Sequence, residues 1–184
     1  MQDDPSTRDK LVITAARLFR QQGYHGTGLA AILAAAGVPK GSLYHHFPQG
    51  KADLARAAVD ITAAELMRIT RDAFAGAEDW RGGATTFCHK MARLFDILDS
   101  ADACPISGLM FEGPDASDFR AHAAAAFERI IAAAAAEGSR LSLSEADARD
   151  AAETLLMSFQ GGWTLARLRR DSGVLRGLPA RLFG

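Results

Sequence analysis

The stretch Gly28–His46 constrains the fold of this chain more than any other part of its sequence. Apolar residues recur at helical spacing before Gly37, and Pro39 suits the first turn of a following helix, where its missing N–H has no intrahelical partner anyway. We therefore expect a short helix near 28–35 and a second over about 39–45, joined by a glycine-centred turn. This pattern is typical of a helix-turn-helix.

Helical patterns also fill the rest of the chain, which is rich in alanine and shows little enrichment in β-branched residues. Polar residues that suit helix starts and glycines that suit helix ends divide these patterns, and Ser144 with Asp147 resembles a capping box. The sequence therefore predicts an all-α protein. The further expected helices are 7–22 ending at Gly23, 51–75, 85–98, 117–137 ending at Gly138, and 144–170 ending before Gly173.

The distribution of charge favours a nucleic-acid partner, although the net charge of the chain is only −1. The stretch from Lys10 to Ala52 contains no Asp or Glu and retains its Lys, Arg and His residues. DNA phosphates require such a positive surface. Because no segment offers about 18 uninterrupted apolar residues and the start lacks the apolar core of a signal peptide, we expect a cytoplasmic protein with no membrane partner. Its two cysteines, Cys88 and Cys104, are expected to be reduced and structural.

The residues GTGLAAILAAAGVPKGSLYHHFPQGKADL, together with the helix that precedes them, resemble the DNA-binding domain of the TetR family of regulators over about residues 7–54. The resemblance implies a recognition helix in double-stranded operator DNA and phosphate contacts at the starts of neighbouring helices. The alternative is a surface helix of an unrelated bundle, and His46 is either a packing residue or a DNA contact. Thr27 is also expected to cap its helix. The DNA-binding residues expected are Thr27, Lys40, Gly41, Ser42, Tyr44, His45 and Lys51.

The run HFPQGKADL, and CPIS ahead of LMFE, resemble the subgroup of LmrA- and YxaF-like repressors within that family. The resemblance implies two domains: a helix-turn-helix domain over residues 1–55 and a helical effector-binding and dimerisation domain over 56–184. It also implies a repressor that a small molecule releases from a palindromic operator. An effector-independent regulator or an activator is the alternative. An enzyme is a remoter one, because the chain has no nucleophile elbow, phosphate loop or HExxH motif.

Aromatic and sulfur-containing side chains in the second domain suggest a pocket for a small hydrophobic or aromatic effector, with a few polar anchors. Ordinary core packing is the alternative for each of them, because apolar residues at helical spacing must be buried somewhere. We expect no catalytic residues, no metal and no cofactor. The candidate ligand-binding residues are Phe87, Met91, Phe95, Met110, Phe111, Glu112, Phe119, His122, Met157, Gln160 and Trp163.

A helix-turn-helix protein usually binds DNA as a symmetric pair, because two recognition helices must reach major grooves about 34 Å apart. We therefore expect a homodimer formed through the last two long helices. Small residues within Ala121–Ala136 would let the helices approach closely, and the alternative is that the apolar residues form an intramolecular core. The expected apolar contacts are Leu155, Leu156, Phe159, Trp163 and Leu165.

Overall fold

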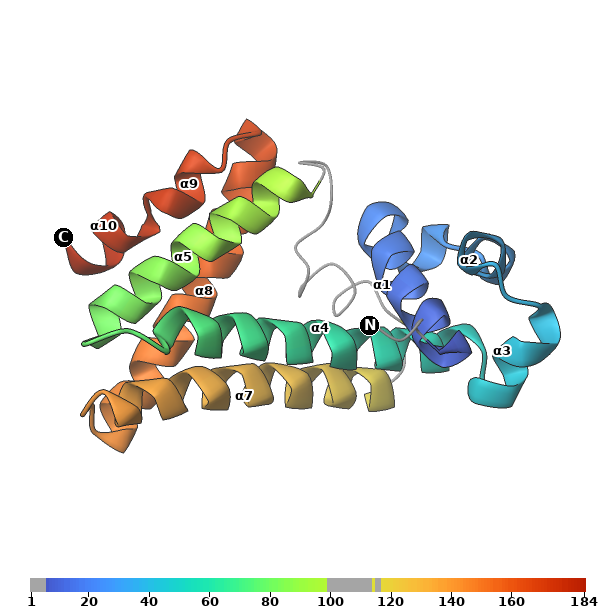
Figure 1. Cartoon of the computed structure of the whole chain (residues 1–184), viewed down its shortest axis with the longest axis horizontal. Coiled ribbons are helices and arrows are strands. Elements are labelled where there is room, and N and C mark those ends of the chain that lie inside the picture. Colours follow the sequence, from blue (N-terminus) through green and yellow to red (C-terminus); the bar gives the residue numbers. More distant parts are fainter. Residues whose placement is uncertain (1–5, 99–113, 115–116) are drawn as a thin grey trace. The chain divides into compact units, whose positions relative to one another are not determined.

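The structure is a computed structural model that describes residues 6–98, 114 and 117–184 (Figure 1). Helices account for nearly all of these residues and none of them lies in a strand, so the all-α prediction is confirmed. No helix among the described residues is long and apolar enough to cross a membrane. The helices are α1 Thr7–Gly26, α2 Leu29–Ala36, α3 Lys40–His46, α4 Lys51–Phe74, α5 Trp80–Ile97, α7 Ser117–Arg140, α8 Glu145–Arg169, α9 Gly173–Arg176 and α10 Leu178–Phe183.

The described residues form two compact units. The first unit holds α1, α2, α3, α4 as far as Ala63 and α7 as far as Ala126. The second holds α4 from Ala64, α5, α7 from Phe127, and α8 to α10. Both α4 and α7 therefore contribute to each unit. A division at residue 55 into two domains stays a prediction, because compactness does not by itself define an independently folding domain.

The first unit is built on α1, which packs against both α2 and α3. Its core consists of large apolar side chains from four helices, all with no exposed surface: Leu11 and Phe19 of α1, Ile32 of α2, Leu43 of α3 and Leu54 of α4. Helix α1 loses helical geometry at Gly23, whose φ is 73° and ψ 165°. Gly23 therefore ends the regular part of α1 as expected, although one more turn continues the helix to Gly26.

The turn between α2 and α3 also has the predicted chemistry. Gly37 adopts the left-handed conformation, with φ 64° and ψ 33°, which only glycine adopts at little cost. Its N–H and that of Val38 return to the carbonyls at the end of α2. Pro39 lies at the N-cap of α3 rather than inside its first turn, so that helix begins at Lys40.

In the second unit, α9 packs against both α5 and α8, and α10 packs against α5. These two short C-terminal helices were not predicted. Gly173 is the first residue of α9. Helix α8 ends at Arg169, and its C-cap Arg170 takes the left-handed conformation with φ 52°. The capping box at the start of α8 is confirmed, because the Asp147 N–H donates to Ser144 Oγ at 3.1 Å.

Two glycine-containing segments that were expected to break helices lie inside them. Helix α5 begins at Trp80 rather than near Thr85, because Asp79 accepts a hydrogen bond from the Gly82 N–H at 2.7 Å and caps its start. Helix α7 passes through Gly138 to Arg140. Gly138 packs closely on α8, since an added Cβ would lie 3.0 Å from the Cβ of Ala148. Both predictions took glycine for a helix end, whereas Gly83 and Gly138 lie inside helices and closely against Phe74 and Ala148.

Candidate nucleic-acid interface and helical body

Helix α3 presents one buried side and one exposed side. Leu43 is fully buried, and Val38 and Phe47 at the two ends of the helix are also buried. The residues predicted to contact DNA lie on the other side: Lys40, Gly41, Tyr44 and His45 are exposed, and Ser42 is partly exposed. His46 is exposed as well, with its ring 5.0 Å from that of His45. This short amphipathic helix therefore offers polar and basic groups to a ligand while its apolar side holds it in the unit.

An ordered turn joins α3, which contains Tyr44, to α4, which begins at Lys51. Gly50 has a φ of 62°, and an added Cβ there would lie 3.6 Å from Tyr44 Cε1. The Asp53 carboxylate reaches back from the first turn of α4 and accepts a hydrogen bond from the Gln49 N–H at 2.8 Å. Asp53 also pairs with Arg56 at 3.1 Å. The first residue of α4, Lys51, is thus held by an ordered turn.

Thr27 does not occupy the position that was expected of it. Its side chain has no exposed surface, and Gly28, not Thr27, is the N-cap of α2. The Thr27 hydroxyl donates to the carbonyl of Gly23 at 2.8 Å and lies 3.2 Å from that of Leu18. The hydroxyl therefore satisfies carbonyls at the end of α1, and the structure offers no Thr27 side-chain group to a DNA phosphate.

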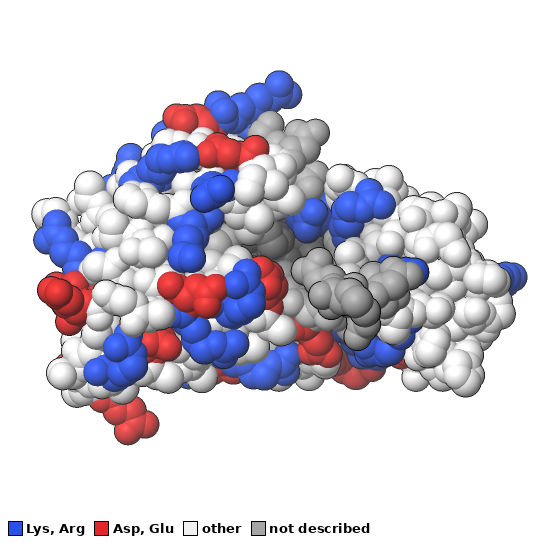
Figure 2. Space-filling model, viewed as in Figure 1, with Lys and Arg blue, Asp and Glu red and all other residues white. Residues whose placement is uncertain are grey.

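The charge of the first unit fits a polyanionic partner. On the face shown in Figure 2, the surface over α2 and α3 is mostly white, with blue at its edge and no red. This agrees with the absence of Asp and Glu between Lys10 and Ala52. A surface without carboxylates does not repel phosphate. The Lys and Arg side chains on it can therefore attract phosphate without an opposing negative charge.

Sequence reasoning missed two residues near the start of α4, Tyr24 and Arg56. The Lys51 Nζ lies 4.2 Å from the ring centroid of Tyr24, which directly follows the kink at Gly23. Arg56, one turn along α4, pairs with Asp53 and with Asp118 of α7. Burial raises the pKa of Tyr24, and the nearby charge of Arg56 opposes that rise. Burial likewise lowers the pKa of Lys51. The position of Tyr24 directly after a helix-ending glycine was the available signal.

The predicted effector residues Phe87, Met91, Phe95 and Trp163 are all buried in the second unit, each at most 4% exposed. They form an aromatic cluster with Phe159. Ring centroids lie 5.6 Å apart for Phe87 and Phe159, 5.7 Å for Phe159 and Trp163, and 5.2 Å for Phe95 and Trp163. The space beside Phe87, between α4, α5, α7 and α8, amounts to about 10 Å³. This space has room for about one water molecule.

Met157 and Gln160 line a different feature, an apolar groove of about 460 Å³ between α7 and α8. Met157 is 66% exposed, so it belongs to the surface and not to an enclosed pocket. The other residues of this groove are Phe127, Glu128, Ile131, Glu153 and Leu156.

The two remaining described candidates belong to the first unit. Phe119 is 1% exposed and packs in its core. His122 Nε2 lies 3.1 Å from the Asp60 carboxylate, so this imidazole joins α7 to α4. Met110, Phe111 and Glu112 lie outside the described residues, as does Cys104.

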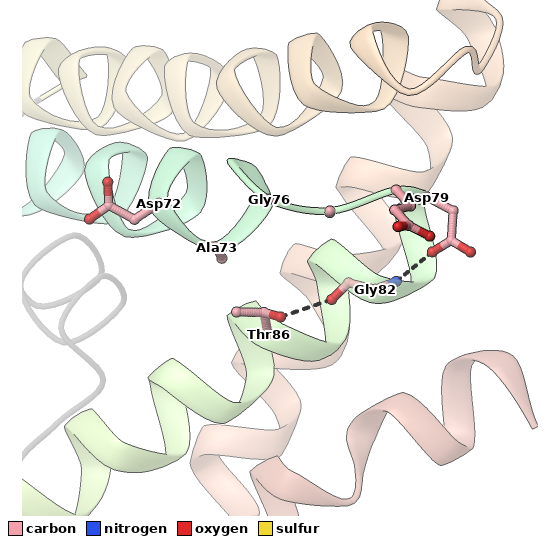
Figure 3. A pocket seen from close by; sticks show the side chains of 8 residues that line it. Asp72, Ala73, Gly76, Asp79, Gly82 and Thr86 are labelled. Carbon is pink, nitrogen blue, oxygen red and sulfur yellow. Dashed lines mark hydrogen bonds between the residues drawn. The ribbon is translucent and has the colours of Figure 1, made fainter.

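A second hollow of about 460 Å³ lies where α4 turns into α5 (Figure 3). It is lined by polar groups, and none of the predicted ligand residues borders it. Two of its carboxylates have structural roles: Asp79 caps α5, and Asp72 pairs with Arg68 at 2.5 Å. Gly82 and Thr86 continue this network through a 3.0 Å hydrogen bond. No aromatic or large aliphatic side chain lines this hollow, so it is a poorer fit for a hydrophobic effector than an apolar pocket.

The expected dimer residues divide between core and surface. Leu155, Leu156, Phe159 and Trp163 are buried in the second unit, so for them the intramolecular alternative is correct. Leu165 is 44% exposed, and Leu168 and Met157 of the same helix are 78% and 66% exposed. On α7 the exposed residues include Ala121, Ala124, Ala125, Ala132 and Ala136. Exposed large apolar side chains therefore exist on α8, and exposed small residues exist on α7.

Family models match both parts of the chain. Residues 11–58 match the model of bacterial regulatory proteins of the tetR family, and residues 82–180 match the C-terminal domain of LmrA/YxaF-like transcriptional regulators. The uncharacterized HTH-type transcriptional regulator YxaF of Bacillus subtilis is 40% identical over 106 residues, which cover 58% of this chain and 56% of that protein. The HTH-type transcriptional regulator LmrA of the same organism is 29% identical over 170 residues, which cover 92% of this chain and 90% of that protein.

Solved structures show the same fold. The reduced form of NemR from E. coli superposes with a TM-score of 0.81 and 23% identity, covering 96% of this chain and 95% of that one. The helix-turn-helix, its acid-free surface and the matched helical body agree with one another. The chain belongs to the TetR family of DNA-binding transcriptional regulators, with a C-terminal domain of the LmrA/YxaF-like type.

Proposed function

We propose that this protein is a cytoplasmic repressor that binds a palindromic operator as a homodimer and leaves it when a small hydrophobic effector binds. The observation that carries the proposal is α3, whose polar and basic side faces away from the core of its unit. In this proposal Lys40, Ser42, Tyr44 and His45 meet bases or phosphates in the major groove, Gly41 allows close approach, and Lys51 meets the DNA backbone. Thr27 is left out because its hydroxyl is buried and bonded within the unit.

The exposed apolar face of α8 supports the homodimer. Met157, Leu165 and Leu168 are large apolar side chains that water surrounds in a single chain. The alanines exposed on α7 let a second pair of helices approach closely. A twofold axis through this face would pair two recognition helices, which a palindromic operator requires.

The contacts between α4 and α7 support a role for these helices in the response to the effector. In the first unit Arg56 pairs with Asp118, and Asp60 with His122. In the second unit Arg140 donates a 2.6 Å hydrogen bond to the carbonyl of Phe74, at the end of α4. We propose that α4, held to α7 in this way, transmits the response. The effector must bind one spacing of the two DNA-binding units of the dimer more tightly than another. A ligand with equal affinity for both arrangements would not shift the equilibrium between them.

DNA binding is tested by selecting genomic fragments with the purified protein and measuring affinity for the selected duplex by fluorescence anisotropy. Lys40→Ala, Tyr44→Ala and His45→Ala should each weaken binding. Arg68→Ala is the matched control, because it removes an exposed positive charge from α4 in the second unit. The contact assignment is wrong if the three α3 variants bind like the control. The DNA-binding proposal itself fails if no duplex is bound above the non-specific level.

An effector-independent regulator is the second candidate, and the filled aromatic core favours it. A thermal-shift screen against aromatic compounds separates the two candidates, because a ligand that binds only the folded state raises the unfolding temperature. A compound that both stabilises the protein and releases it from the selected duplex supports the ligand-responsive repressor. Failure of every compound to stabilise the protein supports the effector-independent regulator.

A further inference from the structure

The ammonium group of Lys51 lies over the face of an aromatic ring in the first unit. Its Nζ is 4.2 Å from the ring centroid of Tyr24, within the distance at which a cation is attracted to a ring face. The Tyr24 ring rests in turn against Phe19, with 5.5 Å between their centroids, and Phe19 is fully buried. Lys51 is therefore positioned by a side chain that is anchored in the core.

The backbone around Tyr24 is also held firmly. Gly23 has a φ of 73°, a conformation that turns the chain out of α1 just before Tyr24. The Thr27 hydroxyl donates to the Gly23 carbonyl at 2.8 Å, and the Thr27 N–H donates to the Tyr24 carbonyl at 3.3 Å. These hydrogen bonds hold the backbone at Gly23 and at Tyr24. The buried Thr27 therefore stabilises the turn that carries Tyr24.

The electrostatics of Lys51 explain why an aromatic partner is useful there. Lys51 is the first residue of α4, where the helix dipole disfavours a cation and attracts an anion. No carboxylate in the described part of the chain forms an ion pair with it, and the nearby Asp53 is held by the Gln49 N–H and by Arg56. A ring face stabilises an ammonium without cancelling its charge, so Lys51 keeps its full charge for a phosphate.

We propose that Tyr24 is a positioning residue for DNA phosphate recognition: its ring holds the ammonium of Lys51 at the start of α4, where a backbone phosphate binds. This inference rests on the proposed DNA contact of Lys51. It assigns Tyr24 no direct contact with a base.

The test is a double-mutant cycle in the full-length protein, with affinity for the selected duplex measured by fluorescence anisotropy between 50 and 200 mM salt. Tyr24→Leu should weaken binding about two- to five-fold, the usual contribution of an exposed cation–π pair. Lys51→Met should weaken binding. It should also make the negative slope of log affinity against log salt shallower by about 0.9, the value for one phosphate contact. In the Lys51→Met background, Tyr24→Leu should have no further effect. Tyr24→Phe should bind like the original protein, because it keeps a ring face.

Each contrary result has a distinct meaning. Absence of DNA binding by the unmodified protein overturns the proposed function. DNA binding that Lys51→Met leaves unchanged overturns the proposed DNA contact of Lys51 and with it the role of Tyr24. An equal loss from Tyr24→Leu in both backgrounds overturns only the role of Tyr24. Thermal unfolding shows whether each variant is folded. Should Tyr24→Leu fail to fold, the proton spectrum of the unmodified protein decides: the ring current of Tyr24 should shift the Lys51 side-chain resonances upfield, and unshifted resonances overturn the inference.

Discussion

Gly83 of α5 lies directly against the ring of Phe74, the last residue of α4. A Cβ added to Gly83 would come within 2.1 Å of Phe74 Cδ1, far inside the distance at which two carbons can approach. Phe74 is fully buried, and its ring also lies 4.9 Å from that of Trp80. The two helices can therefore meet at this corner only because position 83 has no side chain.

We predict that Gly83→Ala lowers the free energy of unfolding by about 1–3 kcal/mol, because the methyl group overpacks a filled core. Chemical denaturation followed by circular dichroism measures the change. Gly82→Ala is the matched control: within 4 Å its Cβ would meet only an oxygen at the end of the exposed Asp79 side chain, at 3.3 Å, and no ring of the core. A loss as large for Gly82→Ala as for Gly83→Ala would contradict the packing explanation.

Thr27→Val should destabilise the protein by about 1–2 kcal/mol, because the carbonyl of Gly23 loses the donor that now lies 2.8 Å away. Thr27→Ser keeps a hydroxyl and should cost less. At temperatures where both variants are folded, Thr27→Val should weaken operator binding only through its effect on the turn at Tyr24. The salt dependence of operator binding should not change. A reduced salt slope for Thr27→Val at unchanged stability would show that Thr27 contacts phosphate after all.

The Cys88 thiol should resist alkylation in the folded protein. Burial raises its pKa to about 11, so almost no thiolate exists at pH 8, and its side chain is only 1% exposed. Iodoacetamide labelling of a Cys104→Ser protein, followed by mass spectrometry, should detect modification only after denaturant is added. Labelling of Cys88 at the rate of a free thiol without denaturant would contradict its burial.

The same thiol makes stability depend on pH. The folded state keeps the Cys88 proton up to about pH 11, whereas the unfolded chain releases it near the ordinary value of 9.0. Between these values the folded state binds more protons, so the Cys88 contribution to the free energy of unfolding falls as pH rises. Cys88→Ala in the Cys104→Ser background should show a shallower decline over this range. Parallel declines for the two proteins would refute the assignment.

Leu168→Glu should convert the proposed dimer into a single chain of 19.6 kDa, because it places a charge on the exposed apolar face of α8. Light scattering after size-exclusion chromatography measures the mass. Ile97→Glu is the control: Ile97 is 72% exposed but lies on α5, so this variant should remain dimeric. Should Ile97→Glu alone dissociate the protein, the interface lies on α5 and not on α8.

Local signals in the sequence were sufficient for the helix-turn-helix and for most helix positions. Gly37 takes the left-handed conformation, Ser144 caps α8, and Leu43 and Val38 are buried as their spacing indicated. These features depend on a few adjacent residues, whose backbone preferences and apolar periodicity are legible without knowledge of distant contacts. The same local reading extended to the exposed side of α3, since residues opposite a buried leucine must face away from the core.

Features that depend on packing between distant segments were decided only by the folded chain. Gly83 and Gly138 resembled helix breakers, yet each allows close approach to another helix, at Phe74 and Ala148. The sequence around Thr27 resembled the start of α2, but its hydroxyl lies beside the carbonyl of Leu18, nine residues away in the chain. The aromatic residues of the body are buried against one another, a packing between distant helices that periodicity alone does not specify. Tyr24 and Lys51 are far apart in the chain, and no local pattern relates an ammonium group to a ring that only the fold brings within 4.2 Å.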